Sequence, residues 1–276
     1  MTPQARYLDL LKRCLTRTAF PERYRPLDLV ARAAQEPRRR LIYPLLKRWL
    51  AQRGVLLMEV VPELPPHVRE EGRDWPQEAE TMIGLRRLDN LQACCEDVLE
   101  HGVSGDFIET GVWRGGASIF MRAVLAAYGD RVRTVWVADS FQGLPKPDPR
   151  YPADAADRWW TFPELVVPLE AVQANFARYG LLDGQVRFLP GFFKDTLPTA
   201  PIGQLAILRL DGDMYESTMD ALTALYPKLT PGGYCIVDDY FAVEACRQAV
   251  EAYRTTHGIR ERITQIDWGG GFWRRP

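Results

Sequence analysis

Acidic residues end two apolar segments of this sequence, and their placement indicates a chemical site. The run Leu205–Leu210 is followed by Asp211 and Asp213, and a second apolar run ends in Asp238 and Asp239. Ligands of α/β proteins bind beyond the carboxyl ends of the strands, where these acids would meet and repel one another unless a cation or a proton is present. All the candidate ligands are oxygens and no histidine is near them in sequence, so Mg²⁺, Ca²⁺ or Mn²⁺ suits the site better than zinc.

A glycine-rich turn after residues 106–110 indicates a second ligand site. Small residues there let the backbone approach a ligand, and the helix that follows offers free N–H groups. Glu109 stands where a dinucleotide-binding fingerprint has its first glycine, and no Walker motif follows, which argues against an NAD-dependent oxidoreductase. An acid at this point would repel a pyrophosphate. It would suit a cationic ligand, such as a sulfonium that also carries an α-ammonium group.

The next predicted strand ends in Asp139, Ser140 and Phe141. An acid at the end of the second strand can accept hydrogen bonds from both ribose hydroxyls of a nucleoside. We expect the ring of Phe141 to pack against the adenine. The two loops together predict a site for a cationic nucleoside.

Strands and helices alternate through the second part of the chain. We predict strands at Asp106–Thr110, Thr134–Ala138, Gln185–Leu189, Leu205–Leu210 and Tyr234–Val237, and helices at about 115–128, 168–180, 217–229 and 243–256. The alternation predicts an α/β fold, in which a mostly parallel sheet has helices on both faces. Ser217 and Asp220 resemble a capping box at the start of one helix. Two β-like pieces within 262–273 predict an antiparallel hairpin at the C-terminal edge.

The beginning of the chain has a different pattern. Apolar residues at helical spacing predict helices over residues 1 to about 54, with Pro26 starting the second helix and Pro37 kinking it. Four prolines make residues 60–80 an irregular connector. A further helix is predicted over Met82–Leu99.

Composition excludes several classes of protein. The 276 residues, 46% hydrophobic and 26% charged, are typical of a soluble globular protein. A formal net charge of -1 gives no basic field for nucleic acid. No run approaches the roughly 20 apolar residues of a membrane helix, and the N-terminus lacks a signal-peptide core. Five cysteines without Cys-x-x-Cys spacing argue against a disulfide framework, so we expect a cytoplasmic protein.

Five motifs occur together in this chain and in one known family. They are Glu109-Thr-Gly-Val-Trp-Arg-Gly-Gly, Asp139-Ser-Phe-x-Gly-Leu-Pro, Lys194-Asp-Thr-Leu-Pro, Leu210-Asp-Gly-Asp-Met-Tyr-Glu-Ser-Thr and Val237-Asp-Asp-Tyr. In this combination the chain resembles the macrocin O-methyltransferase (TylF-like) family over about residues 70–275. The resemblance implies a Rossmann-like methyltransferase fold. Residues 81–276 would be the S-adenosylmethionine-dependent domain, and residues 1–80 a helical N-terminal extension with its connector.

The resemblance also assigns roles to residues. It implies that Asp211, Asp238 and Asp239 hold Mg²⁺, and that Asp213 is the general base. Many family members have Trp where this chain has Phe192, a difference that changes the adenine wall and not the reaction. The resemblance places S-adenosylmethionine on these residues: Thr81, Met82, Glu109, Thr110, Gly111, Ser118, Asp139, Ser140, Phe141, Gly191, Phe192, Phe193 and Asp211.

Members of this family often methylate sugar hydroxyls on antibiotics, so we expect Mg²⁺-dependent O-methylation of a sugar or glycosylated natural product. One alternative is a catechol-type O-methyltransferase, because vicinal phenolic oxygens chelate Mg²⁺ equally well. Another is a non-catalytic S-adenosylmethionine-binding partner, although the acidic trio argues against it. The expected partner is a small-molecule glycoside, not nucleic acid or membrane, and the N-terminal helices suggest a homo-oligomer. Trp159 and Trp160 either cover the acceptor sugar as a lid or anchor a surface loop.

Overall fold

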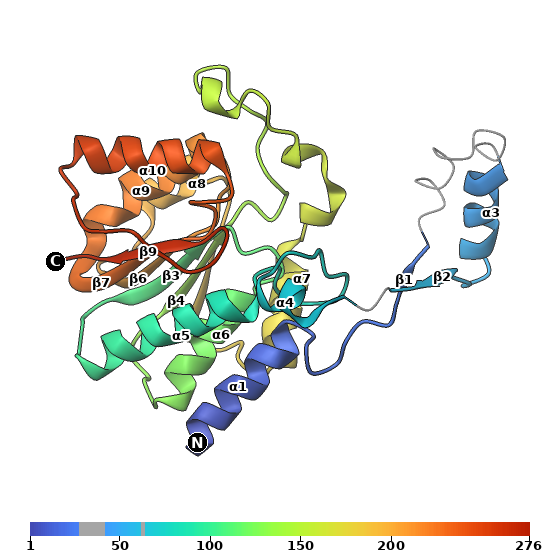
Figure 1. The fold of residues 1–276 in the computed structure, drawn as a ribbon, viewed down its shortest axis with the longest axis horizontal. Helices are drawn as coiled ribbons and strands as arrows, with labels where there is room; N and C mark the ends of the chain where they lie inside the picture. The colour runs from blue at the N-terminus through green and yellow to red at the C-terminus, as the bar shows by residue number, and fades with distance from the viewer. Residues whose placement is uncertain (28–41, 62–63) are drawn as a thin grey trace.

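The computed structural model of the chain describes residues 1–27, 42–61 and 64–276, and its centre is a seven-stranded sheet (Figure 1). The strand order is β5-β4-β3-β6-β7-β9-β8. The first five of these pair in parallel, and β9 pairs antiparallel with β7 and with β8. The strands are β3 Asp106–Thr110, β4 Val135–Asp139, β5 Val186–Pro190, β6 Leu205–Leu210, β7 Leu229–Val237, β8 Thr264–Gln265 and β9 Gly271–Arg274. The predicted mostly parallel sheet with an antiparallel edge hairpin is confirmed.

Strand β7 differs from its prediction, because it begins at Leu229 and not at Tyr234. Leu205 of β6 pairs with Leu229, whereas Ile207 pairs with Tyr234, so the strand contains an irregular insertion between two paired stretches. The glycines of the insertion give no side-chain periodicity from which the earlier start could be predicted.

Helices cover both faces of the sheet, as predicted (Figure 1). They are α5 Leu85–Glu100, α6 Gly116–Ala127, α7 Leu169–Arg178, α8 Phe193–Thr196, α9 Tyr215–Leu225 and α10 Glu244–Thr256, with 3₁₀ turns η5 Leu197–Thr199 and η6 Tyr226–Lys228. Alternate residues of a strand face opposite sides, so Phe107 of β3 packs under α5 and α6 while Ile108 packs under α9 and α10. An apolar layer therefore packs on each face of the sheet, and together the two layers hold the strand ends in place.

The N-terminal region is only partly helical. Helix α1 (Pro3–Leu15) packs against α5 and α6 and buries Leu8 and Leu15. Strand β1 (Tyr24–Pro26) then pairs antiparallel with β2 (Met58–Val60), so the prediction that Pro26 starts a helix is wrong. The predicted kink at Pro37 lies outside the described residues.

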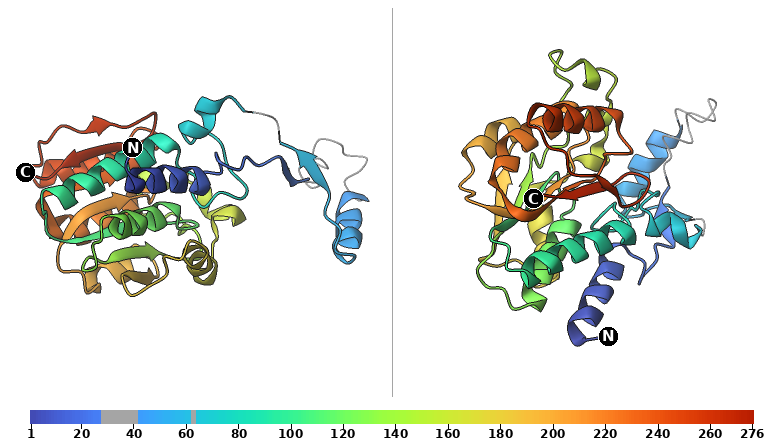
Figure 2. Two further views of the ribbon diagram at one scale, coloured as in Figure 1. Left: turned by 90° about the horizontal axis from the view of Figure 1, so that it is seen from below. Right: turned by 60° about the vertical axis from the view of Figure 1, so that its left-hand side comes forward.

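The arm, defined as residues 20–27 and 42–61, lies apart from the sheet in both orientations of Figure 2. It carries the β1–β2 pair and α3 (Ile42–Ala51). The connector after it is largely irregular, as predicted, but contains the short helix α4 (Pro66–Glu70). No helix among the described residues combines the length and apolarity that a membrane span requires.

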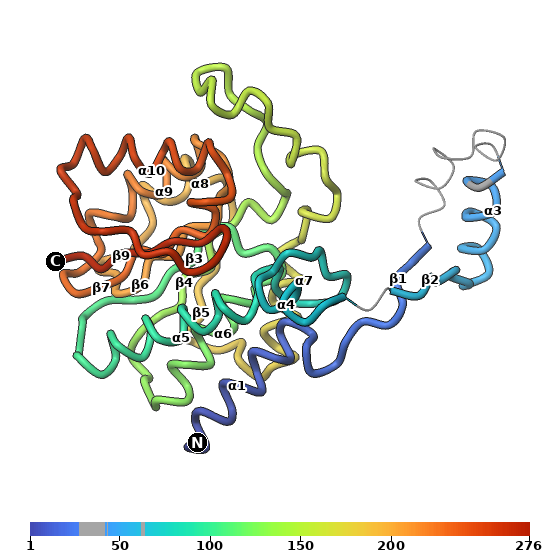
Figure 3. Tube along the Cα trace, viewed as in Figure 1, coloured from blue at the N-terminus to red at the C-terminus, as the bar shows by residue number. Residues whose placement is uncertain are grey.

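A long segment, residues 142–168, leaves the carboxyl end of β4 and returns to α7 (Figure 3). It contains three single 3₁₀ turns, η2 Pro152–Asp154, η3 Trp159–Thr161 and η4 Pro163–Leu165. The buried carboxylate of Asp154 accepts hydrogen bonds from the backbone N–H groups of Tyr215 (2.7 Å) and Glu216 (3.0 Å). Helix α9 therefore begins at Tyr215 with an acceptor from this distant segment, and the capping box predicted at Ser217 is wrong.

Candidate active site

The site lies at the carboxyl ends of β3 and β6, where the strand order reverses direction. Ligands of open α/β sheets bind at such a switch point. The loops after both strands come into close contact here: a Cβ on Gly111 would lie 1.7 Å from the carbonyl oxygen of Asp211. With a φ of 82°, Gly111 also adopts a conformation that other residues rarely take. Only glycine lets the two loops meet, and a pocket opens beside them.

Strained backbone gathers around this pocket. Trp113, Phe141 and Asp213 have positive φ angles of 48°, 56° and 55°. Trp113 and Asp213 line the pocket, and Phe141 directly follows Ser140 of its wall. Such conformations persist where the surrounding structure holds them for a functional purpose.

The pocket wall brings together about half of the residues predicted for the site. The predicted residues on the wall are Met82, Gly111, Asp139, Ser140, Phe192, Phe193, Asp211 and Asp213. The carboxylate of Asp139 accepts hydrogen bonds from the backbone of Val112 (2.7 Å) and Phe141 (2.8 Å), so it also holds both flanking loops. These residues share one cavity although they come from five separate parts of the chain.

The other predicted residues do not line the pocket. Glu109 is buried, ion-paired with Arg209 at 2.6 Å, and accepts a hydrogen bond from Ser118. Phe141 packs in the core near Phe188, with ring centroids 6.4 Å apart, and does not form the exposed wall expected for adenine. The remaining predicted residues that do not line the pocket are Thr81, Thr110, Gly191, Asp238 and Asp239.

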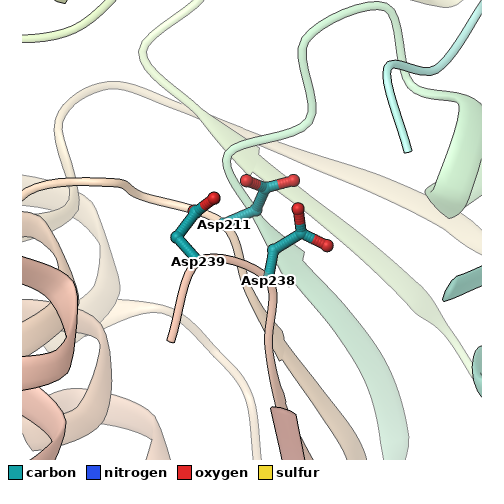
Figure 4. Close-up of side chains that lie close together, drawn as sticks. All are labelled: Asp211, Asp238 and Asp239. Carbon is teal, nitrogen blue, oxygen red and sulfur yellow. The ribbon is translucent and has the colours of Figure 1, made fainter. Parts of the chain in front are cut away.

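Three carboxylates converge at the ends of β6 and β7 (Figure 4). One oxygen from each of Asp211, Asp238 and Asp239 lies within 4.8 Å of the other two, a spacing at which one metal ion could contact all three. The second oxygen of Asp239, Oδ2, is buried and has no hydrogen-bond partner among the described residues. An uncompensated buried oxygen of this kind fits a cation ligand, and the all-oxygen donor set fits Mg²⁺ or Mn²⁺.

Burial and the repulsion of neighbouring carboxylates raise the pKa values of three acids here, Asp211, Asp213 and Asp239. Burial and the charge of Asp238 raise the pKa of Asp211 to about 6. Burial and the charges of Asp211 and Asp238 raise the pKa of Asp213 to about 7. The pKa of Asp239 rises well above its ordinary value through burial and the charge of Asp213. The site therefore has more negative charge than its surroundings compensate, which favours a cation.

Two arginines compensate part of this charge, and sequence reasoning missed both. Arg209 lies near the carboxyl end of strand β6, and Arg87 lies on helix α5; both are buried. Arg209 could have been found from the sequence, because it is a charged residue inside the apolar run Leu205–Leu210. A buried arginine requires acidic partners. Nothing in the local sequence marks Arg87, which reaches the site only when α5 packs on the sheet.

Two aromatic residues of segment 142–168, Trp159 and Phe162, form a cluster with Trp75. Trp75 of the connector stacks on Phe162 (6.0 Å between centroids), and Trp159 packs against both. Neither Trp159 nor Trp160 lines the pocket, whereas Leu165 of the same segment does.

Comparison with known proteins agrees with this fold. The profile of the family described as Macrocin-O-methyltransferase (TylF) matches residues 4–275. The chain belongs to the macrocin O-methyltransferase family. The family predicted from the motifs is confirmed, and with it the prediction of an O-methyltransferase. The methyltransferase fold implies S-adenosylmethionine as the methyl donor.

Relatives from Streptomyces and Micromonospora are similar over most of the chain. The 8-demethyl-8-(2,3-dimethoxy-alpha-L-rhamnosyl)-tetracenomycin-C 4'-O-methyltransferase of Streptomyces olivaceus is 52% identical over 99% of this chain and 95% of its own length. The mycinamicin III 3''-O-methyltransferase of Micromonospora griseorubida is 58% identical over 75% of this chain and 83% of its own. The demethyldecarbamoylnovobiocin O-methyltransferase of Streptomyces niveus is 56% identical over 75% of this chain and 80% of its own length.

Solved structures show the same architecture. The O-methyltransferase NovP has a TM-score of 0.83 and 45% identity, with 99% of each chain covered. The calicheamicin methyltransferase CalS11 has a TM-score of 0.56 over 77% of this chain and 94% of its own, at 19% identity, which supports the fold alone. The Rossmann-like methyltransferase fold predicted from the sequence is confirmed.

Proposed function

We propose that this enzyme transfers the methyl group of S-adenosylmethionine to a hydroxyl of a sugar on an antibiotic-type natural product, with Mg²⁺ as cofactor. The observation that carries the proposal is a pocket with Asp213 on its wall, beside three converging carboxylates. The names of three relatives, each more than 50% identical, describe O-methylation of such compounds and support the acceptor class.

We infer that the pocket between the loops after β3, β4 and β6 binds S-adenosylmethionine. Asp139 would accept hydrogen bonds from the ribose hydroxyls, and the small Gly111 would leave room for the ligand. The rings of Phe192 and Phe193 offer apolar surface to the adenine. Glu109, which we predicted to favour a cationic ligand, would act through its contacts with Ser118 and Arg209, because it does not line the pocket.

Asp211, Asp238 and Asp239 would hold Mg²⁺. When bound, S-adenosylmethionine supplies a methyl group on a positively charged sulfur, and Mg²⁺ supplies a charge that favours the ionised form of a nearby hydroxyl. The unpartnered Oδ2 atom of Asp239 and the raised pKa values of the acids support a cation at this point.

Asp213 would accept the proton of the acceptor hydroxyl. A base is most effective when its pKa lies near the working pH, and that of Asp213 is raised to about 7. It lies in the loop between β6 and α9, two residues after Asp211 of the acid cluster. The position of Asp213 and its raised pKa therefore both favour it as the general base.

The experiment that tests the acceptor class is a panel of deoxysugar glycosides and catechols, with S-adenosylhomocysteine formation followed by mass spectrometry. We expect turnover with a glycoside and little with catechols. A preference for catechols would favour the alternative, a catechol-type O-methyltransferase, and would contradict the proposed acceptor.

We also propose that residues 1–80 serve the methyltransferase domain, residues 81–276, as an extension through which the enzyme forms homo-oligomers. The arm exposes large apolar side chains, with Leu45 69% and Leu56 64% exposed. A surface of this kind marks a protein contact. Light scattering on the wild type and on Leu45→Glu tests the idea: a dimer that becomes a monomer is expected, and a monomeric wild type would contradict it.

Five free cysteines support the proposed cytoplasmic location.

A further inference from the structure

Arg209 is a charged residue in the central part of the sheet, with 1% of its surface exposed. Its register partners are Glu109 on β3 and Ile236 on β7. Side chains alternate along a strand, so Arg209 points to the same face as Asp211, two residues on, and as Asp238, two residues beyond Ile236. The fold therefore places a single guanidinium among three carboxylates from three neighbouring strands.

Arg209 contacts its partners through both terminal nitrogens of its planar guanidinium group. Its Nη1 atom donates to Glu109 Oε1 at 2.6 Å and to Asp211 Oδ2 at 2.8 Å, and its Nη2 atom donates to Asp238 Oδ1. A lysine has one compact ammonium group and cannot reproduce this planar arrangement. The geometry, and not only the charge, thus distinguishes Arg209.

Arg87 binds the other carboxylate oxygen of Asp238. It donates to Asp238 Oδ2, and its Nε atom donates to Asp267 Oδ2 at 2.9 Å. Asp267 in turn accepts the backbone N–H groups of Gly269 and Gly270, both at 2.9 Å, in the turn between β8 and β9. Both oxygens of Asp238 are therefore fixed by arginines that are themselves anchored in separate elements.

We propose that Arg209 and Arg87 are positioning residues that hold Asp238 and Asp211 in the orientation required to bind a divalent metal ion with Asp239. This inference rests on the metal site of the proposed function and goes beyond it. Carboxylates that bind metals are commonly oriented by hydrogen bonds from surrounding groups, and loss of such a partner typically costs about 10–100-fold in metal affinity or activity.

The same network also reduces the repulsion among the acids. Asp238 would otherwise repel Asp211 and Asp239 across a gap of less than 4.8 Å. The two guanidinium groups offset part of this repulsion on the side facing the core. Asp239 Oδ2, which has no hydrogen-bond partner among the described residues, is left available for the ion.

The test is Mn²⁺ binding to the full-length protein, followed by the electron paramagnetic resonance signal of free Mn²⁺, without methyl donor or acceptor. Arg209→Lys keeps the positive charge but removes the planar guanidinium group. We therefore expect the dissociation constant for Mn²⁺ to rise about 10–100-fold. Arg122→Lys is the matched control, because Arg122 on α6 is also buried and forms a bidentate pair with Asp183, and neither residue lines the pocket. The control should bind Mn²⁺ as the wild type does, even if its melting temperature falls.

Melting temperatures separate positioning from general support of the fold. Arg209→Lys that melts lower but binds Mn²⁺ within twofold of wild type would overturn the proposal. If Arg209→Lys does not fold, Arg87→Lys decides, since it releases the same Asp238 from its other oxygen and is expected to weaken Mn²⁺ binding by a similar factor. A wild type that binds no Mn²⁺ would refute the proposed metal site itself, and the positioning role with it.

Discussion

Replacing Asp213 by Asn is expected to abolish methyl transfer and, without divalent metal, to make the protein more stable at alkaline pH. Burial and the charges of Asp211 and Asp238 raise the pKa of Asp213 from 3.8 to about 7. A shift of this size corresponds to at most about 4 kcal/mol for ionising the carboxyl in the folded protein. Asn has the same shape, carries no charge and tolerates the backbone φ of 55° at this position.

The pH dependence has a definite sign. Because the pKa of Asp213 is raised on folding, its contribution to stability is fully present below about pH 4 and is lost as the pH rises through about 7. The advantage of Asp213→Asn over wild type should therefore grow from pH 5 to pH 8 and then level off. Each kcal/mol corresponds to about 2–4 °C in melting temperature for a protein of this size.

Thermal unfolding in EDTA at several pH values measures this difference. Asp183→Asn is the control with the opposite sign, because a hydrogen bond from Arg122 lowers the pKa of Asp183 and the substitution removes a favourable charge. Added Mg²⁺ should reduce the advantage of Asp213→Asn, since a cation offsets the same repulsion. A melting difference that is absent or independent of pH would refute the reasoning.

Three further substitutions separate the parts of the site. Asp239→Asn should abolish Mn²⁺ binding and leave the affinity for S-adenosylhomocysteine within about threefold by calorimetry, because Asp239 does not line the pocket; equal loss of both would contradict this. Asp139→Ala should weaken S-adenosylhomocysteine binding at least tenfold, since hydrogen bonds to a charged group contribute about 1.5–3 kcal/mol each; unchanged affinity would exclude the ribose contact. Asp154→Ala removes the acceptor at the start of α9 and should cost about 0.5–2 kcal/mol of stability in a denaturant titration; an unchanged midpoint would show that the contact contributes nothing.

Local patterns were sufficient for most of the sheet and for the strand ends beside the pocket. Apolar runs that end in acids located β3, β4 and β6, because the carboxyl ends of parallel strands meet at one edge. Asp139 and Asp211 could therefore be placed near each other from sequence alone.

Long-range partners could not be predicted in this way. Glu109 and Arg209 are 100 residues apart and become neighbours only through strand register, which one sequence does not specify. For the same reason Glu109 was predicted to face the ligand directly, whereas its carboxylate is paired inside the protein. Asp154 reaches the start of α9 across 61 residues, which is why a local capping box was predicted instead. The pairing of β1 with β2 joins residues on either side of α3, and its short strands carry no clear alternation.

Turnover measured against metal concentration tests the central claim most directly. The protein would be stripped with EDTA and supplied with S-adenosylmethionine and the glycoside preferred in the acceptor panel, and the product followed by mass spectrometry. We predict no methylated glycoside in EDTA and full recovery on adding Mg²⁺ in excess. Undiminished methylation in EDTA would contradict the role of Asp211, Asp238 and Asp239 as a metal site and, with it, the proposed chemistry.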